Sequence, residues 1–279
     1  MEYLRGKKLI DAIHEHFSLL AHAQGMTLEE MKDKQRVLDE AVRAAGGTRS
    51  GGLTSSRSTF LQWSTASSRA VRNGSTFLYN WTLGNLFAPI AYEKKASPLL
   101  NLPHLLSELI EIHGYEMLIN GSFNGDPHPG NILLLDNGKL GLIDYGQVKH
   151  ISNTQRLQLS QLIVALADKN AVEIVRSLTE MGVKTKYMNP IVLEKLAILF
   201  LDRDDVSVTD DMNPQVYMEH LNALDPIEVI PDDFVMAFRV SLLLRGLSYA
   251  LRYDHVSHAA EWKTLAQQVI QNDAEERLY

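Results

Sequence analysis

Two acidic residues and one amide are spaced so that they could bind a metal ion and serve phosphoryl transfer. Asp126 and Asn131 lie five residues apart in a polar stretch, and Asp144 follows at the end of an apolar run, thirteen residues after Asn131. Phosphoryl transfer needs hard oxygen ligands for Mg²⁺ and a carboxylate near the attacking hydroxyl. We therefore expect Asn131 and Asp144 to bind the metal. Asp126, as the catalytic acid residue, would face the acceptor or an attacking water.

A β-hairpin would bring these residues together. Residues 132–135 and 140–143 are apolar and predict two short strands. Asn137-Gly138 between them is a strong turn signal, since both residues tolerate positive φ. Adjacent antiparallel strands would then place Asn131 and Asp144 side by side, within reach of one ion.

The loop after Asp126 contains two prolines. Pro127 and Pro129 fix φ on either side of His128, and this rigidity suits a loop that must hold a carboxylate in place. For His128 a packing or hydrogen-bonding role and a catalytic role both stay open, and no general-base function is assigned to it. The alternative, a polar turn without chemistry, does not account for the shared order and spacing of loop, hairpin and acid.

The elements around this segment are predicted to be mostly helical. Capping signals start helices at Thr27 with Glu30, at Ser152 with Gln155, and at Asn170. Further helices are predicted at residues 102–118 and near residues 190–201, 214–222, 232–252 and 258–271. The charged run at residues 203–211 is expected to be a solvated loop, because it lacks the ligand spacing of a calcium site.

Three regions follow from this pattern. Residues 1–45 carry the first helices, and residues 101–279 carry the loop, the hairpin and the later helices. Between them, residues 46–100 are expected to form an insertion, rich in Ser, Thr, Gly and Arg at its start and in aromatic residues towards its end. The aromatic stretch at residues 77–92 suits docking onto the domain or peripheral contact with a membrane surface.

Composition excludes several classes of protein. The chain has 279 residues, 45% of them hydrophobic, and a net charge of −7, which argues against a general nucleic-acid binder. The absence of cysteine excludes disulfides and thiolate metal sites. The most apolar stretch, residues 234–251, is interrupted by Arg239 and Arg245, so we expect a buried core helix there and no transmembrane helix.

At this point a family resemblance is visible. The sequence Gly-Asp-Pro-His-Pro-Gly-Asn at residues 125–131, with Leu-Ile-Asp-Tyr-Gly-Gln at 142–147, resembles the UbiB-type (aarF-domain) atypical kinases. Asp144-Tyr-Gly stands for the Asp-Phe-Gly of kinases. The resemblance implies a mostly α (α+β) fold, the protein-kinase-like C-lobe, with a short β-hairpin carrying the metal site and the N-lobe absent. It also implies ATP and Mg²⁺ as cofactors.

The resemblance extends to other parts of the chain and carries a biological setting. Met1-Glu2-Tyr3 followed by Gly6 is similar to the family's hinge, which makes Glu2 and Tyr3 the expected cofactor-binding positions there. Residues 243–247 with Trp262 resemble its terminal helices. The family implies a role in quinone (coenzyme Q) or lipid metabolism, with nucleotide and lipid or quinone-pathway proteins as partners. A mitochondrial or plastid location in association with a membrane is implied as well.

The sequence also departs from the family pattern. Asn124 occupies a position that is often His, and residues 147–149 lead almost directly into a helix without an Ala-Pro-Glu anchor. No phosphate-covering Gly-rich or Ala-rich loop, strand lysine, partner glutamate or Lys-Gly-Gln element is present. We therefore expect a fragment lacking the N-lobe, with weak or no independent catalysis. The phosphate acceptor stays open.

Two alternative functions are compatible with the sequence. A small-molecule phosphotransferase of the aminoglycoside or choline kinase type also uses a Gly-Asp loop, a following Asn and a strand-end Asp, but the Pro-His-Pro sequence and the terminal helices argue against it. The second alternative is a catalytically inactive pseudokinase module that lacks the amino-terminal lobe and binds lipid or protein. Nucleotide binding separates the enzymatic classes from the module.

Overall fold

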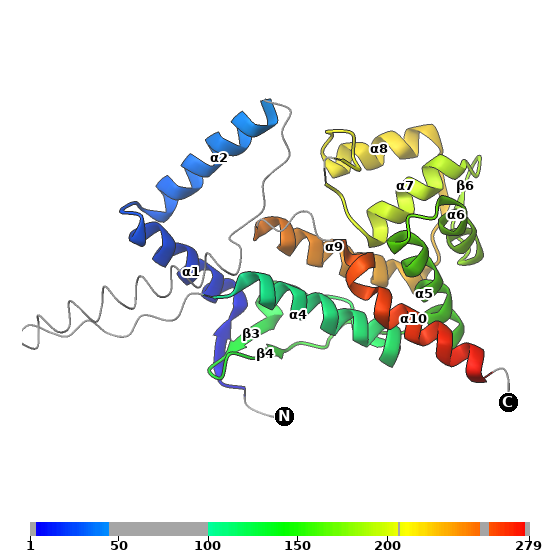
Figure 1. The fold of residues 1–279 in the computed structure, drawn as a ribbon, viewed down its shortest axis with the longest axis horizontal. Coiled ribbons are helices and arrows are strands. Elements are labelled where there is room, and N and C mark those ends of the chain that lie inside the picture. Colours follow the sequence, from blue (N-terminus) through cyan, green and yellow to red (C-terminus); the bar gives the residue numbers. More distant parts are fainter. Residues whose placement is uncertain (1–3, 45–99, 206, 252–256, 277–279) are drawn as a thin grey trace, which may run out of the picture. The chain divides into compact units, whose positions relative to one another are not determined.

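The computed structural model describes residues 4–44, 100–205, 207–251 and 257–276 (Figure 1). These residues form two compact units. The larger unit contains residues 4–9 and the described residues from 105 onward, and the smaller one contains residues 10–44 and 100–104. The expected catalytic loop and hairpin therefore belong to the larger unit.

Some sequence predictions fall outside the described residues. The expected hinge positions Glu2 and Tyr3 are among them, as are residues 46–99 of the expected insertion. The roles assigned to these residues stay predictions.

Two helices make up most of the described part of the smaller unit. Helix α1 spans Leu9–Ala23 and α2 spans Leu28–Ala44. The capping box predicted at the start of α2 is confirmed: Thr27 N donates to Glu30 Oε2 at 2.7 Å, and Glu30 N donates to Thr27 Oγ1 at 3.2 Å. This pair satisfies two backbone donors that the first turn of the helix would otherwise leave free.

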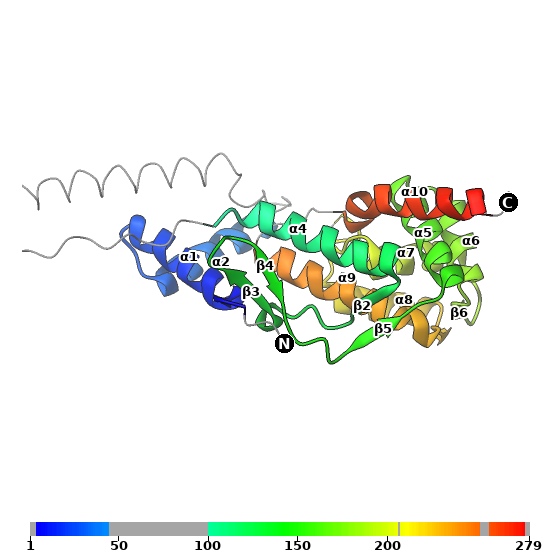
Figure 2. The ribbon, with the colours of Figure 1, turned by 90° about the horizontal axis from the view of Figure 1, so that it is seen from below.

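The larger unit is mostly helical. Its described helices are α4 (Leu102–Tyr115, which begins in the smaller unit), α5 (Asn153–Ala167), α6 (Ala171–Glu180), α7 (Pro190–Leu201), α8 (Pro214–Leu224), α9 (Asp232–Ala250) and α10 (His258–Glu276). The predicted capping box of Ser152 and Gln155 starts α5, and Asn170 caps α6. Helix α10 packs along α5, as Figures 1 and 2 both show.

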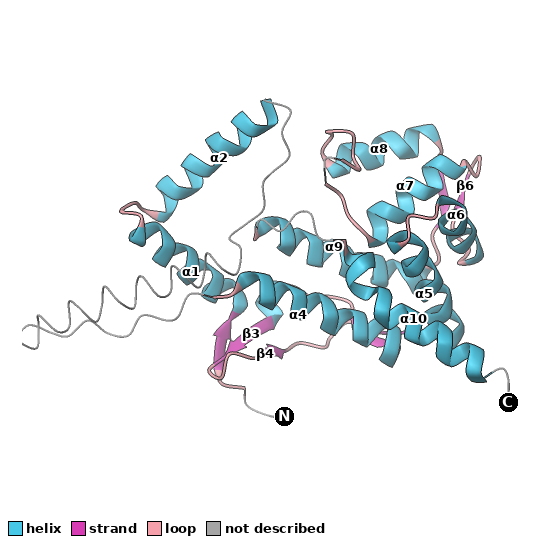
Figure 3. Cartoon of the chain, in the orientation of Figure 1, coloured by secondary structure: helices cyan, strands magenta, loops and turns pink. Residues whose placement is uncertain are grey.

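Among its described residues this mostly helical α+β unit also contains three small antiparallel sheets (Figure 3). The first has the order β1-β3-β4, formed by Gly6–Lys8, Ile132–Leu135 and Leu140–Leu142. The second pairs β2 (Ser122–Asn124) with β5 (Val148–His150), and the third pairs β6 (Lys184–Thr185) with β7 (Ile227–Val229). Residues 125–147, which include the hairpin, thus leave the β2–β5 ladder and return to it.

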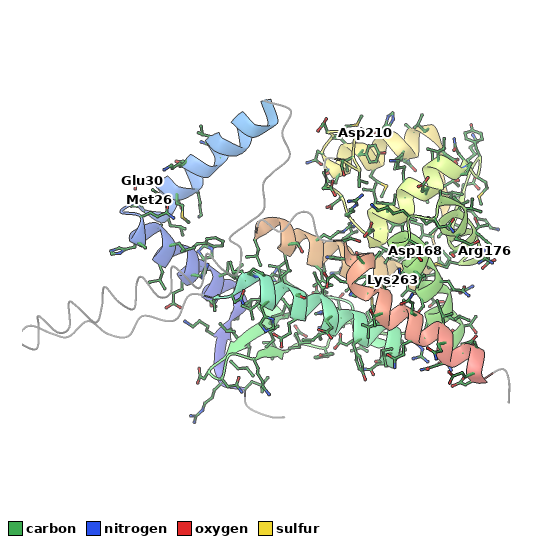
Figure 4. All side chains as sticks on the ribbon, in the orientation of Figure 1. Met26, Glu30, Asp168, Arg176, Asp210 and Lys263 are labelled. Atoms are coloured by element: carbon green, nitrogen blue, oxygen red, sulfur yellow. The ribbon has the colours of Figure 1, made fainter. Side chains whose placement is uncertain are left out.

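Of the residues that the structure describes, Trp262 has the largest fully buried side chain. Its indole Nε1 donates to the backbone oxygen of Ile110 in α4 at 2.7 Å. A Cβ atom at Gly114 would lie 2.3 Å from Trp262 Cδ1, so only glycine lets the ring lie this close to α4. At the surface Lys263, the next residue of α10, forms an ion pair with Asp168 at the end of α5, 2.6 Å apart (Figure 4).

The hairpin turn differs in detail from the prediction. The expected strands are present, although the second ends at Leu142 and not at residue 143. Leu135 N donates to Lys139 O at 2.8 Å, which leaves three residues in the loop. Only Gly138 has a positive φ, 82°, while the Asn137 side chain accepts a hydrogen bond from Lys139 N. A three-residue loop needs one left-handed residue, whereas a two-residue type I′ turn needs two.

Short strands and helix ends account for most other differences. Strand β5 lies where the sequence predicts a direct passage into a helix, because three residues are too few to show an alternating pattern. Helix α4 ends at Tyr115, and residues Glu116–Asn120 form a π-helix, η1, where the sequence predicts continued α-helix to residue 118. Helix α10 extends to Glu276, beyond the predicted end near 271.

The charged run at residues 203–211 is not simply a solvated loop. The Asp205 side chain is only 6% exposed and lies 3.8 Å from Arg203 Nε. Val208 and Thr209 are also buried. A paired charge and local hydrogen bonds let this acidic segment pack against the protein. In the described part of the chain, no group of three or more His, Cys, Asp or Glu residues is arranged to hold a metal ion.

Candidate active site

The loop from Asp126 to Asn131 is held by its own backbone. His128 N donates to Asp126 O and Asn131 N donates to His128 O, both at 2.7 Å. His128 Nδ1 accepts a hydrogen bond from Gly130 N at 3.0 Å, so this side chain caps the short 3₁₀-helix η2 (Pro129–Asn131). Of the two roles left open for His128, the structure shows the hydrogen-bonding one.

The hairpin places Asn131 opposite the residue before Asp144. Ile132 pairs with Leu142, and Ile143 N donates to Asn131 O at 2.9 Å. Asp144 follows at once, with φ = 62°, a left-handed conformation that Asp tolerates better than most residues. Its Oδ1 accepts a hydrogen bond from Gly146 N at 3.2 Å. The backbone of Asn131 and that of Asp144 are therefore brought together as the hairpin requires.

The donor set of these two residues suits a hard divalent cation. An amide oxygen from Asn131 and a carboxylate oxygen from Asp144 are ligands that Mg²⁺ accepts, together with water and phosphate oxygens. Asp144 is exposed and Asn131 partly exposed, so both are open to a ligand. The metal-binding role of both residues stays a prediction.

Asn124, the departure from the family pattern, links both halves of the site. It is 3% exposed. Its side-chain oxygen accepts a hydrogen bond from Asp126 N at 3.0 Å, and its side-chain amide donates to Asp144 O at 3.2 Å. The loop is therefore tethered by the Asn124 amide, which supplies the acceptor and the donor at the same time.

Glu116 forms a second link, from the π-helix η1. Tyr145 donates its hydroxyl proton to Glu116 Oε1 at 3.0 Å, while Asn124 N lies 3.5 Å from Glu116 Oε2 as a donor. Partial burial, reinforced by the negative charge of Glu116, raises the pKa of Tyr145 to about 12. Single π-turns occur often at functional sites, and this one presents Glu116 towards the segment that contains Asp144.

One side of helix α9 lies against the segment from Gly125 to Lys149. Asp233 pairs with Lys149 of β5 at 2.8 Å, and a Cβ atom at Gly125 would lie 2.2 Å from Met236 Cε. Arg239 Nη2 lies 3.4 Å from Asp126 Oδ1. These contacts come from positions three residues apart in α9, which share one side of a helix.

Three of these residues were missed as site residues by reasoning from sequence alone. Asn124 was noted only as a departure, Arg239 only as an interruption of an apolar run, and Glu116 not at all. The one signal available was a charged residue at position 239 within an apolar helix, which needs a partner. Its partner lies 113 residues away in the chain, and local patterns do not contain that information.

Residues 87–178 match the model of the ABC1 atypical kinase-like domain, and this range includes Asp126, Asn131 and Asp144. Over this part the chain is similar to the ABC1 (UbiB, aarF-domain) atypical kinase family. The family predicted from the sequence is therefore confirmed over part of the chain. No described helix is long and apolar enough to cross a membrane.

Members of the ABC1 family from plants and animals are similar to this chain. The chloroplastic protein ACTIVITY OF BC1 COMPLEX KINASE 1 of Arabidopsis thaliana is 30% identical over 148 residues, which is 50% of this chain and 21% of that protein. The AarF domain-containing protein kinase 1 of Gallus gallus is 26% identical over 167 residues, 54% of this chain and 30% of that protein. The matches thus span less than a third of either relative.

A solved structure is also similar in part. It is a Mycobacterium tuberculosis protein in complex with erythromycin, with 17% sequence identity and a TM-score of 0.38. The match covers 60% of this chain and 42% of that chain.

Proposed function

We propose that this chain carries the Mg²⁺-binding and phosphoryl-transfer segment of an ABC1-type ATP-dependent kinase or ATPase, within a protein-kinase-like C-lobe. The observation that carries the proposal is the hairpin register, which sets Asn131 opposite Ile143 and so beside Asp144. The Asp126-to-Asn131 spacing and the family match support it.

Each residue would have a separate task. Asn131 and Asp144 would hold Mg²⁺ through their side-chain oxygens. Held there, Mg²⁺ would supply positive charge that offsets the negative charge on the transferred group. The Asp126 carboxylate would orient the acceptor hydroxyl or water and accept its proton. The Asn124 amide would keep the Asp126 loop at a fixed separation from the backbone of Asp144.

The biological setting of the proposal comes from the family alone. A role in quinone (coenzyme Q) or lipid metabolism follows from the sequence resemblance, and two relatives in Arabidopsis thaliana are named chloroplastic. We propose a plastid or mitochondrial membrane surface as the place of action. The nucleotide elements that the family places before its hinge would have to be supplied by sequence beyond these residues, as expected for a piece of a longer kinase.

Isothermal titration with ATP of a longer protein that includes upstream sequence, in Mg²⁺ or in EDTA, tests the nucleotide site. We expect binding that depends on Mg²⁺ and is lost in Asp144→Ala, because one of the two protein ligands is removed. Asp136→Ala is the matched control, since Asp136 is an exposed acid in the turn of the same hairpin. Equal binding by Asp144→Ala and the wild type would exclude the metal-ligand role. If the wild type binds no nucleotide, the pseudokinase module becomes the better description of this chain.

A further inference from the structure

We infer that Arg239 of α9 is a positioning residue for Asp126, which fixes the carboxylate relative to the segment that follows Asp144. This inference rests on the proposed function for its catalytic meaning. The contact itself can be tested without any nucleotide.

The guanidinium of Arg239 contacts two segments of the site at once. Its Nη2 lies 3.4 Å from Asp126 Oδ1, and its Nη1 donates to Gln147 Oε1 at 2.9 Å. Asp126 precedes the hairpin and Gln147 follows it, three residues after Asp144. The planar fork of an arginine can serve two acceptors in fixed directions, which a lysine ammonium on a flexible stem does less well.

The position of Arg239 is itself fixed by neighbouring contacts of α9. Met236 packs where a side chain on Gly125 would otherwise lie, and Gly125 N donates to Gln147 O at 2.8 Å. Asp233, six residues before Arg239, binds both Lys149 at 2.8 Å and Gln155 at 2.6 Å. Phe234, Phe238 and Val240 are buried on α9. The helix therefore presents Arg239 to the loop as a fixed group.

Charge and exposure favour a positioning role over general stabilisation. The side chains of Arg239 and Asp126 are 43% and 26% exposed. Ion pairs this open to water contribute little to folding stability. They can nevertheless restrict orientation, and a catalytic carboxylate must be held close to its productive geometry. Because Arg239 contacts Oδ1 of Asp126, Oδ2 would be the oxygen that contacts the phosphate acceptor.

Hydrogen–deuterium exchange on the full chain tests this inference in the absence of nucleotide. We expect Arg239→Gln to increase exchange in peptides covering residues 121–131 and 143–150 by about two- to fivefold, with the melting temperature and exchange elsewhere unchanged. Exchange of the same peptides in Arg239→Lys should lie between that of the wild type and that of Arg239→Gln. Arg176→Gln is the matched control, since Arg176 forms exposed ion pairs with Glu173 and Glu180 on α6. Unchanged exchange in the loop overturns the inference, and so does increased exchange throughout the unit with a lower melting temperature.

Turnover gives the second readout. In protein that hydrolyses or transfers phosphate from Mg-ATP, Arg239→Gln should lower kcat by about tenfold or more and leave KM within about twofold. Unchanged kcat would overturn the inference. A wild type without nucleotide binding would refute the proposed function, while the exchange measurement would still decide whether Arg239 holds the Asp126 loop.

Discussion

The side-chain amide of Asn124 donates to the backbone oxygen of Asp144 at 3.2 Å, across twenty residues of sequence. The same side chain accepts a hydrogen bond from Asp126 N at 3.0 Å. One buried amide thus sets the separation of the proposed catalytic acid from the proposed metal ligand. Asn124 stands where the family often has His, and its side chain still tethers the loop.

Asn124→Ala should destabilise the larger unit and loosen the site. The substitution removes a donor and an acceptor from a buried position and leaves Asp126 N and Asp144 O without these partners, at a cost of about 1–3 kcal/mol. Urea unfolding followed by circular dichroism measures the change. Asn272→Ala on the exposed side of α10 is the control, for which a change below about 0.5 kcal/mol is expected. An equally small change for Asn124→Ala would contradict the tethering role.

Glu116→Gln should lower the pKa of Tyr145 from about 12 towards its ordinary value of 10. Partial burial is the first cause of the raised pKa and remains, but the negative charge that repels the phenolate is removed. Absorbance titration near 295 nm, taken as the difference between each protein and its Tyr145→Phe version, isolates this tyrosine. An unchanged titration in Glu116→Gln would show that Glu116 does not act on the Tyr145 hydroxyl.

The same raised pKa predicts an effect on alkaline stability. The unfolded chain loses the Tyr145 proton near pH 10, whereas the folded chain keeps it to about pH 12. The stabilising contribution is therefore complete below pH 10 and is lost between about pH 10 and 12. The wild type should lose more stability than Tyr145→Phe over this range, as measured by urea unfolding at each pH. Parallel curves for the two proteins would contradict the prediction.

His258 should make the protein sensitive to acid. Burial, followed by the positive charge of Arg245, lowers the pKa of His258 to about 3 from 6.5. The neutral ring is favoured in the folded state, so this contribution is present above about pH 6.5 and is lost as the pH falls towards 3. Its size is on the order of a few kcal/mol. His258→Gln should flatten the fall in unfolding free energy between pH 6.5 and 4, and an unchanged slope would contradict this.

Gly114→Ala should destabilise the contact between α4 and α10. The new Cβ would lie 2.3 Å from Trp262 Cδ1, and the buried ring has little room to move, so a loss of about 1–3 kcal/mol or more is expected. Gly246→Ala on α9 is the matched control, because no atom lies within 4 Å of the new Cβ. There the helix propensity of alanine should add about 0.5–1 kcal/mol. Thermal unfolding of both variants compares them, and equal melting temperatures would contradict the packing argument.

Features fixed by neighbouring residues were predictable from the sequence. The capping box of Ser152 and Gln155, the Asn170 cap and the start of α7 at Pro190 depend on positions within one helical turn, and all appear as predicted. The hairpin strands were also found, because apolar runs flank an Asn-Gly turn. The loop length was not predicted, since Asn-Gly suits more than one hairpin loop.

Features fixed by distant residues could not be predicted. The spacing of Asp126, Asn131 and Asp144 predicts a chemistry that stays a prediction, but the bonds that hold Asp126 come from Asn124 and from Arg239. The strand pairing of β2 with β5 joins three-residue segments that carry no periodic signal. The π-turn at Glu116 likewise follows from packing, because its local sequence suits an ordinary helix.

The contacts of α9 and α10 show how far towards its carboxy terminus an expressed piece of this protein should extend. Residues 87–178 match the family model, yet Asp233, Met236 and Arg239 support the loop from more than fifty residues beyond that boundary, and Trp262 closes over Gly114 from further still. A fragment that ends at residue 178 would expose apolar helix surfaces to solvent and remove the contacts of α9 with the loop. Trimming experiments and domain swaps should therefore keep the chain intact through the end of α10.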